Sequence, residues 1–318
     1  MYAMTVMDDR SFRWREVPDP VAGNGELLVE IHAAALNRAD LLQRAGKYPP
    51  PPGWPEWPGL EVSGVVIDAP GCRRWKPGDR VCALLGGGGY AERVVVPEAQ
   101  ALPVPEGVSM VEAAALPEAF ATSWLNLRCE AGLRAGENAL IHAGASGLGI
   151  AAIQTAKLLG ARVITTVGTG EKAEVVRRFG ADVVCNRRKE DPDQLFRDHA
   201  VDVVLDCVGG EALGRQLGML APGGRWVLIA TLGGEFAGIP LRPILKRGIR
   251  LIGSTLRSRS PEEKGRILAE LEREVWPKFA AGAVRPLVYR EFPIGEVEAA
   301  HAVLERHENA GKVVLRIR

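Results

Sequence analysis

The pattern of apolar and polar positions divides the chain into regions with different periods. From residue 1 to about residue 115, the apolar positions form short runs rich in β-branched residues, which predicts strands separated by turns. The expected strands are residues 26–36, 60–69, 80–85 and 90–96. Between the first two lies a short helical pattern that ends in a loop rich in proline and tryptophan. The first region is therefore predicted to be a β-rich domain.

From about residue 118, apolar runs of strand length alternate with helical patterns. The expected strands are residues 139–141, 161–167, 183–186, 201–208, 225–231 and 250–256. The expected helices between or before them are residues 118–132, 148–160, 171–179, 191–199 and 211–220. This alternation predicts an α/β domain with a parallel sheet and right-handed crossovers. Six such strands favour the doubly wound order, which binds a nucleotide where the strand order reverses.

The last part of the chain is expected to return to the first domain. Residues 261–281 predict one long amphipathic helix, because the segment opens with a proline and acidic residues. Two short strands, 287–293 and 312–317, follow around a helix at 295–308. Because the parallel sheet is already complete, these strands are expected to join the β-rich domain. The predicted domains are thus 1–117, 118–260 and the returning segment 261–318.

A glycine turn at residues 138–152 is the strongest motif in the chain. Gly147, Gly149 and Ala152 fit the dinucleotide pattern G-x-G-x-x-G/A between a strand and a helix. Backbone N–H groups at a helix N-terminus can hold a pyrophosphate only if no side chain keeps it away. A glycine turn that merely links a strand to a helix is the alternative. The apolar run at 161–167 follows at the spacing of a βαβ unit of about 30 residues, which favours the nucleotide site.

The residues after the second strand of this unit indicate which cofactor binds. NAD-binding folds place an acid there to hold the ribose hydroxyls. This chain has Gly168, Thr169 and Gly170 instead, with Lys172 nearby and Arg187 and Arg188 after the next strand. Cations and hydroxyls suit a 2′-phosphate, so the pattern predicts NADP(H). The alternative is that Lys172 opens a solvated helix and both arginines are surface charges.

Composition and charge narrow the classes of function. The 318 residues carry a net charge of +1, which argues against a nucleic-acid or anionic-membrane partner. No apolar run approaches the ~20 residues of a membrane-spanning helix. The N-terminus has no signal-peptide pattern, so a cytoplasmic location is expected. The five cysteines form no C-x-x-C pair and lie near no histidine, which argues against a zinc site or a disulfide framework.

The whole chain resembles the zinc-free quinone oxidoreductases of the medium-chain dehydrogenase/reductase superfamily. The runs that carry the resemblance are LNRADLLQRAGKYPPPPG, PGLEVSGVV, KPGDRV, GGYAE, LPEAFATSW, HAGASGLGIAAIQTAKLLGA, VLDCVGG, GSTLRSR and AGKVVL. The first run and LRSR point to the subfamily of the stress-induced animal NADPH:quinone oxidoreductase. The resemblance implies a GroES-like β-rich catalytic domain plus a Rossmann domain with a doubly wound parallel sheet. It also implies a homodimer, with the strand near 250–256 as the edge for pairing.

The resemblance implies a site without a metal. Zinc alcohol dehydrogenases have a cysteine ligand where this chain has Asn37. They have a Gly-His-Glu motif where this chain has Gly59, Leu60 and Glu61, and their four-cysteine lobe is missing here. Two ligand positions are therefore lost, and no metal is expected.

The resemblance also assigns roles to individual residues. Asn37 and Thr122 are placed near the nicotinamide, and Tyr48 is placed at the mouth of the substrate site. The residues assigned to the pyrophosphate are those of the turn: Ser146, Gly147, Leu148 and Gly149. The residues assigned to the 2′-phosphate follow later in the chain: Gly168, Lys172 and Arg187. Two positions depart from the family, which often has Tyr in place of Arg187 and in some members a second Tyr in place of Leu42.

Each transferred role has a structural alternative. Asn37 fits the position that caps the helix after the first long strand. Tyr48 could be a buried ring whose hydroxyl is tied to the backbone. Asp40 and Glu61 are better explained by helix capping and ion pairing than as general acids. Lys312 could reach the cofactor or be a charge at a strand end, and it is left outside the predicted site.

The sequence thus predicts NADPH-dependent reduction of quinones or similar electron-poor carbonyl compounds, by hydride or electron transfer without zinc. Without zinc nothing polarises an alcohol, which disfavours alcohol oxidation. Quinones need less activation, and the protein would supply mainly positioning between its two domains. One alternative is an NADPH-dependent enone or enoyl reductase. The other is a protein that binds NADPH without turnover, in a structural or RNA-binding role.

Overall fold

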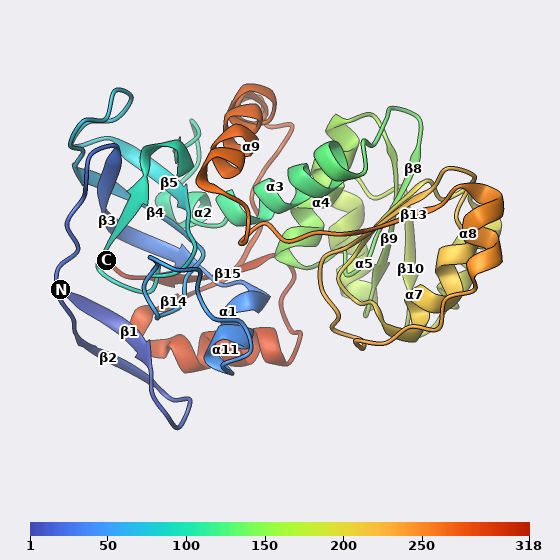
Figure 1. Ribbon diagram of the computed structural model, residues 1–318, viewed down its shortest axis with the longest axis horizontal. Coiled ribbons are helices and arrows are strands. Elements are labelled where there is room, and N and C mark those ends of the chain that lie inside the picture. The colour runs from blue at the N-terminus through green and yellow to red at the C-terminus, as the bar shows by residue number, and fades with distance from the viewer. The chain divides into compact units, whose positions relative to one another are not determined.

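The computed structural model describes residues 1–318, which form two compact units (Figure 1). One unit consists of Met1–Ala121 and Arg257–Arg318, and the other of Thr122–Leu256. The sequence pattern puts the corresponding boundaries after residues 117 and 260. No helix is both long and apolar enough to cross a membrane. The cytoplasmic location stays a prediction.

The second unit is built on a parallel sheet of six strands. Its strands are β8 (Asn138–Ile141), β9 (Arg162–Val167), β10 (Val183–Asn186), β11 (Val203–Asp206), β12 (Arg225–Leu228) and β13 (Arg250–Gly253). Their order in the sheet is β10-β9-β8-β11-β12-β13, and every neighbouring pair is parallel. This is the doubly wound order that the sequence predicts. The order reverses at β8, directly before the glycine turn.

Helices cover both faces of this sheet. They are α4 (Gly147–Leu158), α5 (Gly170–Arg178), α6 (Asp193–Asp198), α7 (Gly210–Gln216) and α8 (Leu241–Arg247). Figure 1 shows α4 on one side of the sheet and α7 and α8 on the other. The core under α6 and α7 is centred on the fully buried Trp226, whose ring stacks on Phe196 at 6.1 Å. Because both faces are covered, the strands are nearly continuous apolar runs.

The first unit contains a mixed seven-stranded sheet and a separate hairpin. The large sheet has the order β14-β15-β3-β4-β5-β7, with β6 also paired to β3. Its strands are β3 (Glu26–Ala35), β4 (Glu61–Asp68), β5 (Arg80–Leu84), β6 (Arg93–Pro97), β7 (Ala101–Pro103), β14 (Val288–Pro293) and β15 (Lys312–Arg316). The last strand, β15, lies antiparallel beside β3. Alternate side chains of β3 are buried, as expected for a strand with one face on the core.

Three strands of this unit are not predicted by the sequence pattern. They are β1 (Tyr2–Val6) and β2 (Phe12–Glu16), which form the hairpin, and the short β7. Most of β2 is exposed and three of its five residues are charged, so it lacks the apolar alternation that identifies a half-buried strand. A strand of three residues such as β7 is too short to show a period.

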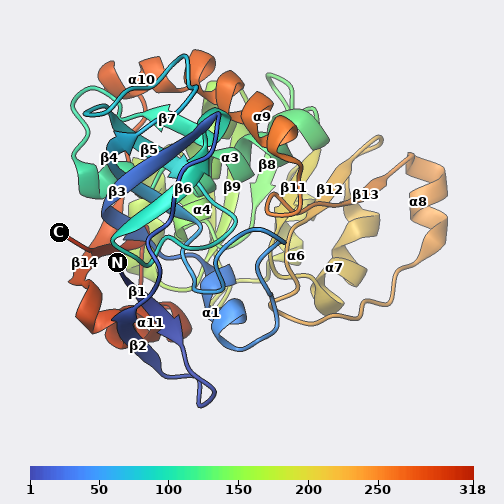
Figure 2. The same cartoon turned by 60° about the vertical axis from the view of Figure 1, so that its left-hand side comes forward.

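Helices of the first unit are short apart from one near the C-terminus. They are α1 (Arg38–Arg44), α2 (Met110–Ala113), α9 (Pro261–Glu274), α10 (Trp276–Ala280) and α11 (Val297–Glu305). The prediction of a single helix over 261–281 is wrong, because α9 ends and α10 begins around Val275. Pro277 lacks an N–H group and is tolerated only in the first turn of a helix, so the chain starts a new helix there. Figure 2 shows α9 and α10 beside β7.

The predicted helix at 118–132 changes its type along its length. It starts as α3 (Pro117–Trp124) and continues as a π-helix over Leu125–Glu130. Hydrogen bonds in a π-helix span five residues instead of four, and such segments are frequent at functional sites. Apolar periodicity does not distinguish the two helix types over so few residues.

Candidate active site

The turn between β8 and α4 presents backbone N–H groups at a helix N-terminus. Ser146 is the N-cap of α4, and its hydroxyl oxygen accepts the N–H of Gly149 at 3.0 Å. Gly147 and Leu148 open the helix, where N–H groups have no partner within the helix. Such a helix start favours an anionic group. The turn thus offers the donors that an anion needs, and the assignment of the pyrophosphate to it stays a prediction.

The structure gives Gly149 a packing role in addition to the one that the sequence suggests. A Cβ atom on Gly149 would lie 2.5 Å from the carbonyl oxygens of both Ala143 and Gly144. A side chain there would collide with the turn itself, so this glycine allows α4 to pack against its own connection. Gly144 is similarly required, since its Cβ would lie 1.9 Å from the hydroxyl of Thr165 on β9. The predicted motif does not include Gly144.

Three cations gather where β9 ends. A Cβ on Gly168 would lie 3.7 Å from Nη2 of Arg187 and 3.8 Å from Nε of Arg188, so both guanidinium groups border this residue. Lys172 follows on α5, whose N-cap is Thr169. Burial lowers the pKa of Lys172, and the positive charges of Arg188 and Arg187 lower it further. We call Lys172, Arg187 and Arg188 the cation cluster.

The two arginines of the cation cluster have no acid to balance their charge. Their side chains are exposed and take part in no ion pair with a carboxylate. Like charges held close together repel one another, so an anionic ligand would lower the energy of the cluster. The sequence pattern counts Arg188 among the cations that predict NADP(H), whereas the resemblance assigns only Gly168, Lys172 and Arg187 to the 2′-phosphate.

Thr122 lies in the last turn of α3, beside the π-helix. Its carbonyl oxygen accepts a hydrogen bond from Nδ2 of Asn126 at 2.7 Å. Asn126 is 1% exposed, and its side-chain oxygen has no hydrogen-bond partner. A buried polar atom without a partner is uncommon in folded proteins. The sequence pattern does not single out Asn126.

Asn37 is held by a buried network in the first unit. Asn37 occupies the N-cap position of α1, but its side chain points to other partners. Its oxygen accepts a hydrogen bond from Nζ of Lys312 at 2.7 Å, and its Nδ2 donates to Glu61 Oε1 at 3.0 Å. Lys312 also donates to the carbonyl of Leu36 at 2.7 Å and pairs with Glu61 Oε1 at 2.5 Å. The Asn37 amide therefore has one fixed orientation.

Lys312 lies in the protein interior, where it takes part in this network. Lys312 is 6% exposed and Glu61 is completely buried, so this ion pair lies out of water. The interpretation of Glu61 as an ion-pair partner is confirmed. Asn37 is one of the two positions at which the resemblance places a lost metal ligand, the other being Leu60, and its side-chain oxygen contacts the ammonium group. Nowhere in the chain do three or more His, Cys, Asp or Glu side chains cluster as metal ligands would.

Asp40 serves the start of α1. Its carboxylate accepts the N–H groups of Asn37 at 2.7 Å and Gly59 at 3.1 Å, and the hydroxyl of Tyr90 at 3.3 Å. Complete burial raises its pKa to about 6, against the lowering effect of these hydrogen bonds. The contact with the N–H of Asn37 is the capping interaction that the sequence suggests. Tyr90 in turn contacts Nε2 of the buried His301 at 3.3 Å.

Tyr48 follows α1 in the proline-rich loop. Its ring lies under the guanidinium group of Arg257, with 4.8 Å from the guanidinium carbon to the ring centroid. Its hydroxyl forms no hydrogen bond, so the alternative of a hydroxyl tied to the backbone is wrong. Burial raises the pKa of Tyr48, and the positive charge of Arg257 opposes this shift. The hydroxyl is thus left with its proton and free to donate it.

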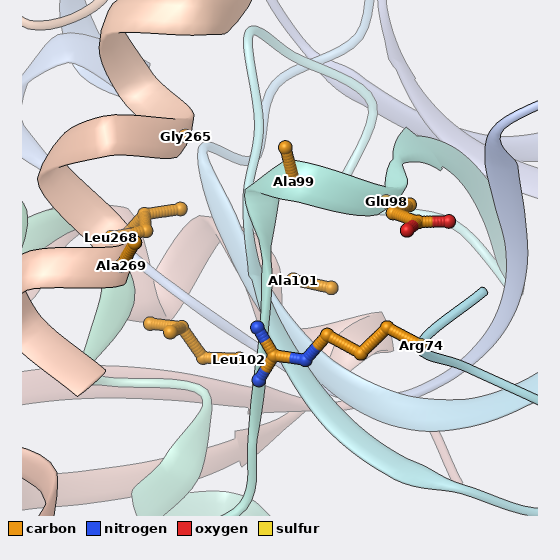
Figure 3. Close-up of a pocket in the computed structure, with 8 residues that line it drawn as sticks. All are labelled: Arg74, Glu98, Ala99, Ala101, Leu102, Gly265, Leu268 and Ala269. Carbon is orange, nitrogen blue, oxygen red and sulfur yellow. The ribbon is translucent and has the colours of Figure 1, made fainter. Parts of the chain in front are cut away.

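A small pocket in the first unit lies apart from these residues in the sequence. It has a volume of about 200 Å³ and lies between α9 and the segment 98–102. Figure 3 shows Gly265, Leu268 and Ala269 of α9 on one side, with the Arg74 side chain extending across the floor. The guanidinium of Arg74 already pairs with Glu272 at 2.6 Å. No predicted site residue lines this pocket, and it is smaller than the ~300 Å³ typical of ligand sites.

Comparison with known proteins identifies the family. Residues 23–106 match the alcohol dehydrogenase GroES-like domain, and residues 147–273 match the zinc-binding dehydrogenase family. The quinone oxidoreductase-like protein 2 of Bos taurus is 31% identical over 307 residues, which cover 95% of this chain and 87% of the relative. The chain belongs to the medium-chain dehydrogenase/reductase superfamily. The expected GroES-like domain plus Rossmann sheet is thereby confirmed.

Solved structures of this superfamily match over the full chain. The quinone oxidoreductase of Thermus thermophilus, solved also with NADPH, has a TM-score of 0.86 and 34% identity, with 100% of both chains covered. An NAD-dependent alcohol dehydrogenase has the same TM-score at 30% identity and the same coverage. The CurK enoyl reductase has a TM-score of 0.85 at 25% identity and covers 99% of this chain and 98% of its own.

The chain also matches one part of much larger proteins. A highly reducing polyketide synthase of Cordyceps militaris is 34% identical over 317 residues, which cover 96% of this chain but 12% of the synthase. The same architecture thus occurs alone and within multifunctional enzymes. These matches establish a pyridine-nucleotide oxidoreductase of the medium-chain family and leave its substrate and the form of its cofactor to be proposed.

Proposed function

We propose that this protein reduces quinones, or similarly electron-poor carbonyl compounds, with NADPH and without zinc. The observation that carries the proposal is the cation cluster beside Gly168, in a chain whose relatives include quinone oxidoreductases. Three neighbouring cations suit the doubly charged 2′-phosphate that distinguishes NADPH from NADH. No carboxylate occupies the end of β9 to hold a ribose diol.

Residues of the two units have separate tasks in this proposal. When bound, NADPH supplies the hydride. Ser146, Gly147, Leu148 and Gly149 bind its pyrophosphate, and Thr122 and Asn37 orient the nicotinamide. Tyr48 donates a proton to the reduced carbonyl oxygen, because its hydroxyl is unpartnered and neutral at physiological pH. Lys312 pairs with Glu61 and binds Asn37, a position of a lost metal ligand in the resemblance, and a quinone needs no Lewis acid to accept a hydride.

A substrate panel tests the proposed function. NADPH consumption is followed with a para-quinone, an ortho-quinone and an alkenal, each with and without a metal chelator. Turnover that requires a quinone and is insensitive to the chelator is the expected result. Turnover confined to the alkenal would instead assign the protein to enone reduction. Tight NADPH binding with no turnover on any substrate would identify a non-catalytic binding protein.

Enone or enoyl reduction is the second candidate function. Two observations favour it, namely the unpartnered hydroxyl of Tyr48 and the structural similarity to the CurK enoyl reductase. Hydride addition to an enone leaves an enolate that needs a proton, and Tyr48 could supply it. The alkenal arm of the substrate panel separates this candidate from quinone reduction.

We further propose that the protein forms a homodimer through β13. This strand is the edge of the parallel sheet, so one side of it has unpaired N–H and C=O groups. Large apolar side chains are exposed on β13 and on the preceding helix α8: Leu241 (69%), Leu245 (83%) and Leu251 (44%). Helix α8 has no buried residue at all. Two copies related by a two-fold axis would pair the strands and cover these side chains.

A further inference from the structure

Arg257 is buried in the first unit and contacts three segments of it. The residue is 5% exposed. Its Nε donates to the carbonyl of Gly86 at 2.8 Å, Nη1 to the carbonyl of Tyr48 at 3.0 Å, and Nη2 to Oε1 of Gln43 at 2.6 Å. The flat face of the guanidinium group covers the ring of Tyr48. Both the backbone and the ring of Tyr48 are therefore fixed by this one side chain.

The positive charge of Arg257 has no counter-ion. All three hydrogen-bond acceptors are neutral, and Arg257 forms no ion pair with a carboxylate. Burial lowers the pKa of Arg257, against the attraction of Asp40 and Glu118. Burying a cation without a paired anion is costly, so buried charges in proteins are normally paired. A structural link between three neutral oxygens would not require a charge.

The surroundings of Arg257 hold the proline-rich loop in place. Gln43 donates from Nε2 to the carbonyl of Glu56 at 2.7 Å, and Trp57 donates to the carbonyl of Gly88 at 3.0 Å. A Cβ on Gly86 would lie 2.6 Å from the ring of Trp54, so the loop packs directly on this glycine. Residues 54–57 of the loop are thus held by contacts that do not involve Arg257. Near Tyr48, the loop is held by the hydrogen bond from Arg257 to the carbonyl of Tyr48.

We propose that Arg257 is a positioning residue, which holds Tyr48 as proton donor to the carbonyl being reduced and stabilises the phenolate that proton transfer leaves. The inference rests on the proposed function and adds the origin of the proton. The O–H bond of Tyr48 breaks while an O–H bond forms on the reduced substrate. The bonding electron pair stays on the oxygen of Tyr48, beside the guanidinium charge. NADPH would supply the two electrons as hydride, and a proton taken up from the solution restores the hydroxyl of Tyr48, so the net reaction consumes one proton.

The charges around the pair are few. Tyr48 is influenced by Arg257, which favours the phenolate, and by Glu118, which opposes it. Arg257 is influenced by Asp40 and Glu118, and its carbonyl accepts a hydrogen bond from Lys264 at 2.9 Å. Replacing Arg257 by a neutral residue therefore removes the main positive charge acting on the hydroxyl. The pKa of Tyr48, already raised by burial, should rise further.

A double-mutant cycle tests the inference. The variants are R257Q, which keeps planar donors without charge, R257K, which keeps the charge, Y48F, and R257Q/Y48F. General acid catalysis contributes on the order of 10²-fold or more, so Y48F should lower kcat by about that factor. R257Q should lower kcat by about tenfold or more, with an unchanged KM for NADPH. R257K should recover part of the loss.

The decisive result is the effect of R257Q when Tyr48 is already absent. If Arg257 acts through Tyr48, R257Q should change kcat by less than about threefold in the Y48F background. An equal loss in both backgrounds would overturn the inference. R44M is the matched control, because Arg44 also covers an aromatic ring, that of Phe12, and donates to a backbone carbonyl. R44M should leave kcat unchanged.

A measurement without turnover separates this inference from the proposed function. The phenolate of Tyr48 is titrated by its near-ultraviolet absorbance, as the difference between wild type and Y48F and between R257Q and R257Q/Y48F. The R257Q substitution should move the titration to higher pH. An identical titration in both backgrounds would contradict the coupling between Arg257 and Tyr48. A protein with no quinone or enone turnover but with the shifted titration would refute only the function.

Discussion

Lys312 turns its ammonium group inward, onto the carbonyl of Leu36, the amide oxygen of Asn37 and the carboxylate of Glu61. This inward orientation removes it from any role in phosphate binding, although it lies in a segment that resembles the family closely. The exposed charges in the cation cluster are those of its two arginines, Arg187 and Arg188. At the scale of residues, Lys312 thus stabilises the interior of the first unit, whereas the cation cluster lies where an anionic ligand could bind.

The cation cluster predicts the preference for NADPH over NADH. In the variant K172A/R187A/R188A the affinity for NADPH should fall by at least about tenfold, because even one hydrogen bond to a charged group contributes roughly 1.5–3 kcal/mol. The affinity for NADH should change little. Calorimetric titration of both nucleotides measures the effect. R177A is the control, since Arg177 lies on the same helix as Lys172 but pairs with Glu174 at 2.8 Å. An unchanged ratio of affinities would refute the assignment.

His301 predicts a dependence of stability on pH. Burial lowers its pKa from 6.5 to about 3. His301 therefore binds a proton more readily in the unfolded chain than in the folded protein. The free energy of unfolding should decrease as the pH falls from 6.5 to about 3. Relative to H301F, wild type should lose about 1.4 kcal/mol of unfolding free energy per pH unit in this range. Asp40 acts in the opposite sense between 3.8 and about 6 but is present in both proteins.

Denaturant unfolding of wild type and H301F at several pH values measures this difference. A phenylalanine keeps the ring contact with Phe12, whose centroid lies 4.7 Å from that of His301. Parallel stability curves for the two proteins across the acidic range would show that His301 is protonated in the folded state.

At the scale of elements, the connection from β8 to α4 makes the nucleotide site. The strand ends at Ile141, the turn folds back onto β9 through the hydrogen bond from the N–H of Gly144 to the carbonyl of Thr166 at 3.0 Å, and Ser146 starts the helix. Ala143 adopts a φ of 53°, a left-handed conformation that is uncommon outside glycine. The tight turn brings the start of α4 close to the end of β9, where the cation cluster begins.

Gly149 is predicted to be essential for this connection. In G149V the side chain would collide with the carbonyls of Ala143 and Gly144, so the turn must shift. The expected loss of unfolding free energy is roughly 1–3 kcal/mol, with weaker NADPH binding. G170A is the matched control at the start of α5, because a Cβ there meets nothing within 4 Å. Thermal unfolding and nucleotide titration measure both variants. Equal behaviour of G149V and G170A would contradict the packing role.

Local sequence pattern predicts the elements that have a clear period and a buried face. The six strands of the parallel sheet and their order follow from the alternation of apolar runs and helices, and the glycine turn from its residues. The hairpin of β1 and β2 is not predicted from the sequence, because β2 is mostly charged and exposed. The pattern also misses the break at Val275 although Pro277 marks it, since the amphipathic period continues across it.

Contacts between residues far apart in the sequence limit how much of the candidate site can be predicted from the sequence. The sequence identifies Asn37, Tyr48, Lys172 and Arg187 through the resemblance, and their roles stay predictions. It does not identify Arg257 as the partner of Tyr48, because 209 positions separate them. Nor does it decide between the two interpretations of Lys312, whose contact with Asn37 spans 275 positions. Such pairs depend on the packing of strands that no local period records.

At the scale of the whole molecule, the edge strand β13 and helix α8 expose the apolar side chains of Leu241, Leu245 and Leu251. An open sheet edge with apolar neighbours promotes association in any protein that does not protect it. The proposed homodimer covers this edge with an identical one. In the first unit Tyr2 and Trp14 are 44% and 37% exposed and stack on each other, and Val21 stands alone in an exposed segment.

Introducing charged side chains into the proposed interface tests the homodimer. In L241E/L245E two glutamates would lie unpaired in an apolar contact, which is strongly unfavourable. Wild type should sediment as a dimer and the variant as a monomer that keeps its fold. V21E is the control, because Val21 is 85% exposed in the other unit and should not affect association. A wild-type protein that is monomeric at all concentrations would contradict the proposal.

The most direct test of the central claim compares the two nicotinamide cofactors with one para-quinone as acceptor, in the presence of a chelator. The measured quantity is kcat/KM for NADPH and for NADH. Quinone-dependent oxidation with at least a tenfold preference for NADPH is the predicted result, equivalent to about 1.4 kcal/mol from the 2′-phosphate. Equal or better use of NADH, or nucleotide oxidation that does not depend on the quinone, would contradict the account.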